Sequence, residues 1–439
     1  MGSHPLSESD WPHPVVAWST VAAFCVTAVL SYTDRQILSL LVDPIRADLR
    51  ISDSQVGVLQ GVAFALVYSF AGLPLGRLAD VVSRRRVILA GVALWSAGTL
   101  ICGYSGSFWA LFFGRMVVGV GEAALAPAAT SMIADLFPAK HRGVAIGLFV
   151  MGMVMGGGVA ILLGGAVLSA ASSGSFSGIP LLSGQAPWRA SLIILGLLGL
   201  PMLLALSLVR EPPRREVAAV ERGERRLGNV VGQLGSAKRV LVPLVLGCGL
   251  MSVGDFATLS WAPTLLSRSY GLRPAEIALI LGPSIVAAGV VACLGGGALS
   301  DWAARRRGPS GRLILAAISA CAALPFSLLV FARTPALVIA AVALWSLFST
   351  VGGVVGLTAL QELVPNRVRG LGTSIVAFGN IMLGLGGGAT LTGVVADHLM
   401  RDPRALDRSL TLVIAPAGAM AILLFLAAAR SARSVTACD

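Results

Sequence analysis

Charged residues are scarce in this chain of 439 residues. Asp, Glu, Lys and Arg make up 12% of it, whereas soluble domains contain about 25%. Hydrophobic residues account for 56%. So few charges cannot cover the surface of a soluble globule of this length, so the composition excludes that class and favours an integral membrane protein.

The motifs of several enzyme and pump classes are missing. The sequence has no GxxxxGK[ST] phosphate loop, no HExxH zinc motif and no GxSxG nucleophile turn. The four histidines lie in tails or at the ends of apolar runs, and none is paired with a cysteine. We therefore expect that the chain is not an enzyme and not an ATP-driven pump of the phosphate-loop type.

Cysteine patterns for metals or disulfides are also missing. The six cysteines are scattered, without a CxxC pair, and five of them lie in apolar runs, where cysteine behaves as a small hydrophobic residue. No metal or cofactor is expected. The polar residues 1–14 lack a basic segment, so we expect no cleavable signal peptide.

Long apolar runs recur from end to end of the chain. A run of about 20 residues can cross a hydrocarbon core of about 30 Å as a helix. Twelve such runs are predicted, at 15–43, 54–80, 86–105, 108–136, 143–170, 188–210, 240–268, 275–300, 311–332, 335–361, 370–397 and 409–430. The 52 glycines suit close helix packing in lipid. The predicted fold is an all-α membrane protein with twelve transmembrane helices.

Two loop patterns occur twice at nearly the same offset. Residues 76–85, GRLADVVSRR, return 221 residues later as GALSDWAARR at 297–306. Residues 136–143, LFPAKHRG, return 227 residues later as LVPNRVRG. Internal repeats of this kind are typical of transporters built from two similar helix bundles.

The repeats divide the chain into three parts. Residues 1–210 are predicted to form one six-helix bundle and residues 240–439 a second, pseudo-symmetric one. Residues 211–239, rich in Arg and Glu, are predicted to be a cytoplasmic linker.

The net charge of +12 is explained by short loops that fix topology and not by nucleic-acid binding. The even-numbered loops with the linker and the C-terminal tail carry 21 Lys and Arg, and the odd-numbered loops carry 8. Positive residues stay on the cytoplasmic side, so both termini are expected there. We expect a monomer in a plasma or bacterial inner membrane, with membrane lipids as its surroundings.

These motifs are where the chain resembles a known family. The doubled GxxxD…RR loop, the twelve helices and the basic linker resemble the major facilitator superfamily. Residues 32–35 (YTDR), 53–57 (DSQVG) and 119–123 (GVGEA) resemble its Spinster branch, which is associated with export of sphingolipids and lysophospholipids. The pattern departs from the family at Val81 and Ser83, where a basic residue and a glycine are usual, and the fifth helix lacks the Gly-Pro of antiporters.

Four charges inside predicted helices need a reason, because a charge at the centre of a membrane helix costs roughly 2.5–3.5 kcal/mol even on a lenient scale. They are Asp34 and Arg35 on the first helix, and Arg115 and Glu122 on the fourth. At 1.5 Å per residue, the first three share one depth, and Glu122 lies about 10 Å further along the axis from its nearest cation. The resemblance implies that both helices line a central cavity.

Two interpretations of these charges remain. Glu122 is the first candidate for a proton carrier and Asp34 the second, while Arg35 and Arg115 are candidates for binding a substrate phosphate or carboxylate. The alternative is a buried ion-pair network that only ties the two helices together.

The second half repeats only one of these charges. Asp34 corresponds to Asp255, but Arg35 becomes Phe256. Asp255 and Asn380 are predicted to belong to the substrate site; the alternative for Asp255 is a local polar contact. One charged wall facing a mostly apolar one suits an amphiphile with an anionic or zwitterionic head.

The doubled loops are predicted to form gates. Asp80 and Asp301 accept hydrogen bonds at helix ends in this interpretation, and the basic residues that follow hold the opposite half in one conformational state. The alternative is that the arginines only signal topology. The predicted gate residues are Asp80, Arg84, Arg85, Asp301, Arg305 and Arg306.

The function predicted from the sequence is secondary active transport by alternating access, coupled to protons, of a sphingolipid- or lysophospholipid-like amphiphile. An organic-anion or drug carrier of the same superfamily and a transport-inactive receptor with the same fold are the alternatives. The sequence leaves open whether transport is symport, antiport or uniport.

Overall fold

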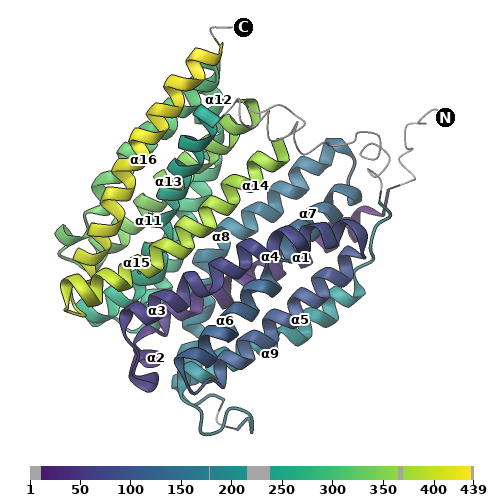
Figure 1. Ribbon diagram of the computed structural model, residues 1–439. Helices are drawn as coiled ribbons and strands as arrows, with labels where there is room; N and C mark the ends of the chain where they lie inside the picture. The colour runs from purple at the N-terminus through teal and green to yellow at the C-terminus, as the bar shows by residue number, and fades with distance from the viewer. Residues whose placement is uncertain (1–10, 177, 215–237, 364–368, 437–439) are drawn as a thin grey trace.

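The described chain is helical throughout. The computed structural model describes residues 11–176, 178–214, 238–363 and 369–436, and these contain helices and connecting turns but no strand. The first half, purple to blue, lies beside the second half, teal to yellow (Figure 1).

The first half contains six membrane spans. Three of them are interrupted: α1 continues into a 3-10 turn, α3 and α4 join at Gly61, and α6 and α7 join at 123–124. The short α2 lies between the first two spans. The bounds are α1 Pro14–Gln36, α2 Val42–Leu49, α3 Asp53–Gln60, α4 Val62–Val81, α5 Arg84–Gly103, α6 Phe108–Glu122, α7 Leu125–Leu136, α8 Ala139–Ser172 and α9 Pro187–Leu208.

The second half also contains six spans. The 50-residue α12 is two helices joined at Arg307 and Gly308, where Gly308 has φ of +60°, a conformation that favours glycine. The eleventh span alternates between α-helix and π-helix. The bounds are α11 Lys238–Tyr270, α12 Pro274–Ala323, α13 Pro335–Leu363, α14 Arg369–Gly379, a π-helix Asn380–Gly387, α15 Gly388–Val394, a π-helix Val395–Met400 and α16 Leu406–Thr436.

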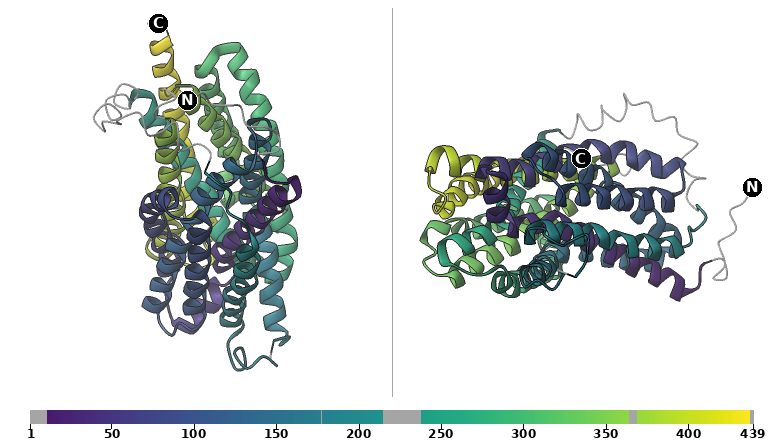
Figure 2. Two further views of the ribbon diagram at one scale, coloured as in Figure 1. Left: turned by 90° about the vertical axis from the view of Figure 1, so that its right-hand side faces the viewer. Right: turned by 90° about the horizontal axis from the view of Figure 1, so that it is seen from below.

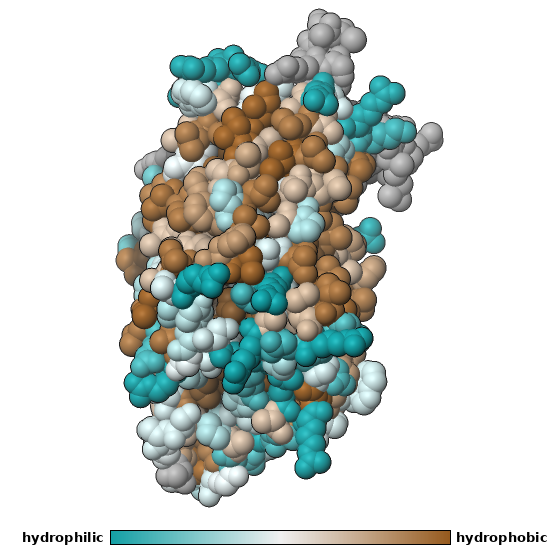
Figure 3. Space-filling view, turned by 90° about the vertical axis from the view of Figure 1, so that its left-hand side faces the viewer, coloured by the Kyte–Doolittle hydropathy of each residue, from teal (hydrophilic) through white to brown (hydrophobic). Residues whose placement is uncertain are grey.

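The prediction of a twelve-helix membrane protein is confirmed. Eleven described helices are long and apolar enough to cross a membrane, and one of these, Pro274–Phe331, contains two spans. The face in Figure 3 is mostly apolar, with polar side chains gathered toward its top edge and its lower part. Exposed leucines such as Leu294 and Leu423 suit contact with lipid.

Local sequence explains where several helices begin. Ser52 and Gln55 form a reciprocal cap in front of α3, with the Ser52 hydroxyl accepting from the Gln55 backbone. The Ser83 hydroxyl accepts from the backbone N–H of Arg86 at the start of α5. Proline begins α9 and α12, where its missing N–H costs nothing.

The two halves cross closely where α8 meets α12. A side-chain carbon at Gly158 would lie 2.4 Å from the carbonyl oxygen of Gly282, and one at Gly165 would lie 2.3 Å from the side chain of Ala278. These glycines therefore permit a backbone approach that a larger residue would block. The halves also meet where α3 packs against α15.

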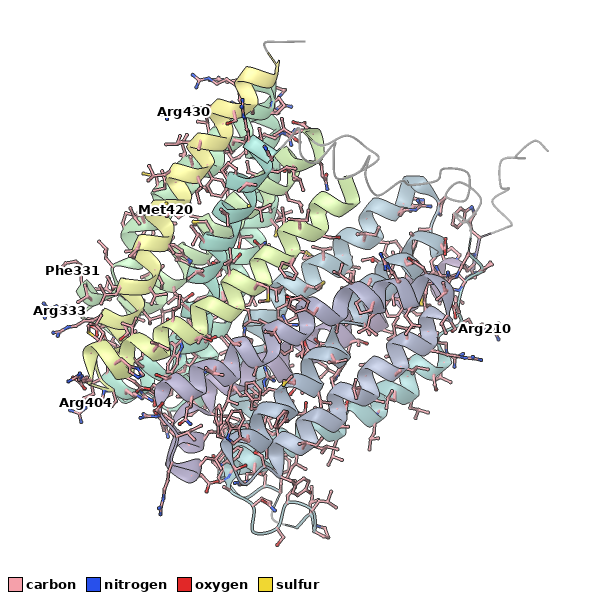
Figure 4. The ribbon with its side chains drawn as sticks, viewed as in Figure 1. Arg210, Phe331, Arg333, Arg404, Met420 and Arg430 are labelled. Carbon is pink, nitrogen blue, oxygen red and sulfur yellow. The ribbon has the colours of Figure 1, made fainter. Side chains whose placement is uncertain are left out.

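The first turn of α1 and the last turn of α16 lie at the same end of the molecule, here called the termini end (Figures 1 and 2). Arg210 and Arg430 lie toward this end in Figure 4, whereas Arg333 and Arg404 lie at the opposite end. Helix α9 ends at Leu208 and α11 begins at Lys238. Most of the predicted linker, residues 215–237, lies outside the described residues.

Candidate functional site

A buried ion pair joins the first and fourth spans. The Arg35 Nη2 atom lies 2.6 Å from Glu122 Oε2, and the two side chains are 4% and 0% exposed. The Arg35 guanidinium also lies 4.7 Å from the Tyr32 ring centre, 4.5 Å from that of Phe64 and 5.2 Å from that of Tyr68. Arginine suits such a site because its flat cation can pair and stack at once.

This pairing corrects the predicted isolation of Glu122. The depth estimate placed its nearest cation about 10 Å along the helix axis, because it measured backbone positions only. The long Arg35 side chain spans that offset and reaches the carboxylate. Glu122 therefore has a direct cationic partner, while its Oε1 atom has no hydrogen-bond partner among the described residues.

Asp34 points away from its neighbour Arg35. Its Oδ2 accepts a 2.5 Å hydrogen bond from the Thr99 hydroxyl on α5, and its Oδ1 has no hydrogen-bond partner in the described part of the chain. A void of about 10 Å³ lies beside it, within the first half, and Trp95 and Met202 belong to its walls. The two acids predicted to share one pocket thus lie in different surroundings.

Arg115 is 1% exposed and faces backbone oxygens. Its Nε atom donates to the Leu59 carbonyl at 3.4 Å and its Nη1 atom to the Asp34 carbonyl at 3.5 Å. The guanidinium also lies 5.3 Å from the Phe64 ring centre. Arg115 thus contacts the backbones of the first two spans, and no described residue forms a hydrogen bond with its Nη2 atom.

A cavity of about 210 Å³ lies between the two halves. Asp255 is the one charged residue among the described residues that line it. The Ser349 hydroxyl donates to Asp255 Oδ2 at 2.7 Å, and Asp255 Oδ1 is buried without a hydrogen-bond partner among the residues that the structure describes. The lining consists of Tyr32, Met153, Gly157, Asp255, Phe256, Thr258, Leu259, Ile285, Val342, Ser346 and Thr350.

The structure brings together only part of the predicted substrate site. Asp255 and Tyr32 border the cavity, and Arg35 stacks on the Tyr32 ring. Asn380 begins a π-helix and is absent from the cavity lining; its Oδ1 atom is buried and unpaired. The roles predicted for these residues in binding stay predictions.

In the first loop motif, Arg84 holds the first half together. This side chain, 2% exposed, pairs with Asp135 on α7 and lies 3.3 Å from Glu211 after α9. Arg85 donates to the Ser207 carbonyl. Asp80 is exposed and makes no hydrogen bond or ion pair with a described residue. The described contacts of the motif stay within its own half and the first residues of the predicted linker.

The second motif differs from the first. Arg305 and Arg306 are exposed, and Arg306 lies over the Trp302 ring. The buried position is taken instead by Arg312, which lies 2.8 Å from Glu362 and 3.7 Å from Asp301. The repeat register pointed to Arg305 as the counterpart of Arg84, but the α12 helix continues to the Arg307–Gly308 kink and carries Arg305 on its surface.

Sequence reasoning missed an ionic clamp between the halves at the end opposite the termini. Arg268 on α11 lies 2.6 Å from Asp43 and 2.8 Å from Asp53, which is 1% exposed. Beside it, the Ser54 backbone N–H donates to Asp397 at 2.5 Å. Asp53 belongs to one of the motifs quoted above, whereas Arg268 was counted only as a loop charge. The clamp could have been predicted only by pairing these two residues.

Two helix bundles with a cavity between them, and charges buried in the cavity's surroundings, define the class of secondary membrane transporters. The profile of the Major Facilitator Superfamily matches residues 24–391. The chain belongs to the Major Facilitator Superfamily, whose members are transporters and not enzymes.

Individual relatives agree with this assignment. The chain is 27% identical to an "MFS-type efflux pump" of Mycolicibacterium smegmatis over 445 residues, which cover 99% of each chain. It is 27% identical to "Protein spinster homolog 1" of Xenopus tropicalis over 422 residues, covering 91% of this chain and 76% of that protein. The predicted likeness to the Spinster branch is therefore confirmed.

Solved structures share the fold. One is a bacterial homolog of the human lysosomal transporter Spinster in an inward-facing, unoccupied conformation, with a TM-score of 0.74 at 24% identity over 95% of this chain and 96% of that one. A D-xylose–proton symporter follows with a TM-score of 0.64 at 16% identity, covering 93% and 97%.

Proposed function

We propose that this transporter works by alternating access, is driven by protons and carries an amphiphilic lipid-like substrate across a plasma or bacterial inner membrane. The observation that carries the proposal is the buried pair of Arg35 and Glu122. It lies directly behind Tyr32, which is part of the wall of the cavity between the halves.

Proton coupling follows from the chemistry of that pair. A proton on Glu122 removes the negative charge, but Arg35 stays charged because a guanidinium does not deprotonate. The buried cation then lacks its partner, which is costly at this depth. Arg35 gains by turning toward another anion, so protonation of Glu122 and occupancy of the cavity become linked.

The clamp at the opposite end supplies one of the two gates. With both termini on the cytoplasmic side, Arg268, Asp43 and Asp53 lie at the external end and hold the halves together there. The loop arginines at the termini end bind within their own halves in the same state. This combination supports an inward-facing conformation.

An amphiphile suits the walls of the cavity. Leu259, Ile285 and Val342 give it apolar contact surface, whereas its polar groups are few. The likeness to proteins named Spinster supports a sphingolipid or lysophospholipid. The relative named as an efflux pump supports a second candidate, a drug carrier of the same superfamily.

The test is transport of radiolabelled lysophosphatidylcholine into proteoliposomes under a pH gradient. Glu122→Gln keeps the hydrogen bond to Arg35 but cannot accept a proton, so it is expected to abolish the pH-driven part. Glu276→Gln is the matched control, since Glu276 is an exposed acid at the start of α12. Equal pH-driven flux in Glu122→Gln and wild type contradicts proton coupling; absence of flux in wild type contradicts this choice of lipid.

A further inference from the structure

The described lining of the central cavity contains a carboxyl group but no lysine or arginine. Asp255 is the charged residue of its described lining, and Asp255 Oδ1 is buried without a hydrogen-bond donor. The other oxygen accepts from the Ser349 hydroxyl, and the Trp345 side chain also lies close to the carboxyl group. A buried carboxylate oxygen without a donor is costly, and a ligand that supplies a donor or a positive charge removes that cost.

The nearby arginines do not neutralise this carboxylate. Arg35 is paired with Glu122, and Arg115 contacts backbone carbonyls of the first half. Neither belongs to the cavity lining. A purely anionic head group entering this cavity therefore meets Asp255 and no described lysine or arginine in the wall.

The remaining walls suit an organic cation. Phe256 presents an aromatic ring, which attracts ammonium groups through its negative face, whereas the Tyr32 ring already has Arg35 stacked on it. The hydroxyl of Thr258 is already bonded to the backbone oxygens of Gly254 and Asp255, so few oxygens remain for a bare metal ion, which takes six or more.

We propose that Asp255 is the recognition residue for a positively charged nitrogen of the substrate, with the aliphatic body of the substrate against Leu259, Ile285 and Val342. The inference rests on the proposed function, because it assigns a chemical class to the substrate of that same cavity. It selects a cationic or zwitterionic amphiphile over a purely anionic one.

The test is equilibrium binding of radiolabelled octyltrimethylammonium to the protein in nanodiscs, with empty nanodiscs subtracted. Asp255→Asn keeps the side-chain shape and removes the charge, so affinity is expected to fall roughly tenfold to a hundredfold. Asp255→Glu is expected to restore most of the affinity. Glu276→Gln removes an exposed acid outside the cavity lining and is expected to bind like wild type.

Competition on the wild-type protein decides the matter even when Asp255→Asn does not fold. Octylamine is expected to displace the label, whereas octanol and octyl sulfate are not. If octyl sulfate displaces the label as strongly as octylamine does, the proposal is wrong. It is also wrong if sodium chloride displaces the label as strongly as choline chloride does at the same ionic strength.

The binding test of Asp255 and the flux test of Glu122 can fail independently of each other. Binding that depends on Asp255 with unchanged pH-driven flux in Glu122→Gln keeps the cation site and removes proton coupling. The reverse result, loss of pH-driven flux without Asp255-dependent binding, removes only the cation site.

Discussion

The two halves have the same arrangement of helices but bury different polar contacts at its centre. In the first half, Arg35 and Glu122 form an ion pair inside a ring of aromatic side chains. At the corresponding place in the second half, Asp255 meets a serine hydroxyl. Both contacts tie a half's first span to its fourth, so the repeat preserves the connection while its chemistry diverges.

The comparison suggests that the two halves have different roles in transport. A paired charge that can be broken by a proton suits energy coupling, whereas a single carboxylate open to the cavity suits ligand recognition. Pseudo-symmetry therefore constrains where the polar contacts lie, and it leaves their roles to differ between the halves.

The largest expected effect is on stability in the first half. Arg35→Met leaves Glu122 buried without its partner, which is expected to lower the free energy of unfolding by about 3–5 kcal/mol. Ser349→Ala, which breaks the matching contact in the second half, is expected to cost only about 1 kcal/mol. Thermal unfolding of detergent-solubilised protein measures both.

A double variant checks the cause. Arg35→Met with Glu122→Met removes both charges and is expected to recover most of the stability lost by Arg35→Met alone. No recovery in the double variant means that lost packing, and not the unpaired charge, caused the effect.

The second comparison sets the two ends of the molecule against each other. Arg268→Gln weakens the clamp that closes the end opposite the termini, so the population is expected to shift away from the described state roughly tenfold or more. Asp80→Asn leaves the contacts of the described state unchanged, because Asp80 is predicted to act as a gate in the other state. Any shift in population is therefore expected toward the described state. Distances between spin labels at the termini end measure both shifts, and shifts of the same sign contradict the gate assignment.

Close crossing of the halves gives a smaller effect. Gly158→Ala places a methyl group 2.4 Å from the Gly282 carbonyl, and overpacking of this kind costs typically about 1–3 kcal/mol. Gly147→Ala is the matched control on the same helix, since nothing lies within 4 Å of an added carbon there. A lower unfolding temperature for Gly158→Ala alone is expected; equal temperatures mean that the halves do not need this contact.

The smallest effect concerns pH at the termini end. Burial raises the pKa of Glu211, but hydrogen bonds from the Ser83 hydroxyl and the Arg84 backbone outweigh it, so the pKa lies below its ordinary value of 4.5. A lowered pKa stabilises the folded state above pH 4.5, and this stabilisation disappears as the pH falls through the folded-state pKa.

Glu211→Gln is therefore expected to lower the unfolding temperature by about 2 °C or less at pH 7 and to match wild type in acid. Unfolding scans of the two proteins between pH 7 and pH 3 measure the difference. A difference that grows as the pH falls contradicts the assigned direction.

Much of the fold could be predicted from the sequence. The apolar runs locate the spans because lipid demands continuous helix, and the doubled loops locate the two halves. The kink at Gly308 was harder to predict, since the sequence around it is typical of an ordinary loop. An ion-pair network between the first and fourth helices was one of the two interpretations from the sequence, but the particular pair of Arg35 and Glu122 was not predicted, because axial depth ignores the reach of a long side chain.

The clamp was missed for a different reason. Arg268 and Asp53 lie 215 positions apart in the chain, and no repeat relates them. The packing of the two halves, with α3 against α15 and α15 against α11, brings such residues together. Asp255 was found because it repeats Asp34, but its place in the cavity wall required the structure.

The central claim is that the first half couples transport to protons while the second half binds the substrate. Proteoliposomes containing Glu122→Gln or Asp255→Asn test it when pH-driven uptake and exchange of radiolabelled lysophosphatidylcholine are measured side by side. Glu122→Gln is expected to lose pH-driven uptake but to retain exchange, and Asp255→Asn is expected to lose both. If the two variants lose the same activities, or if Asp255→Asn retains full exchange, the division between the halves is wrong.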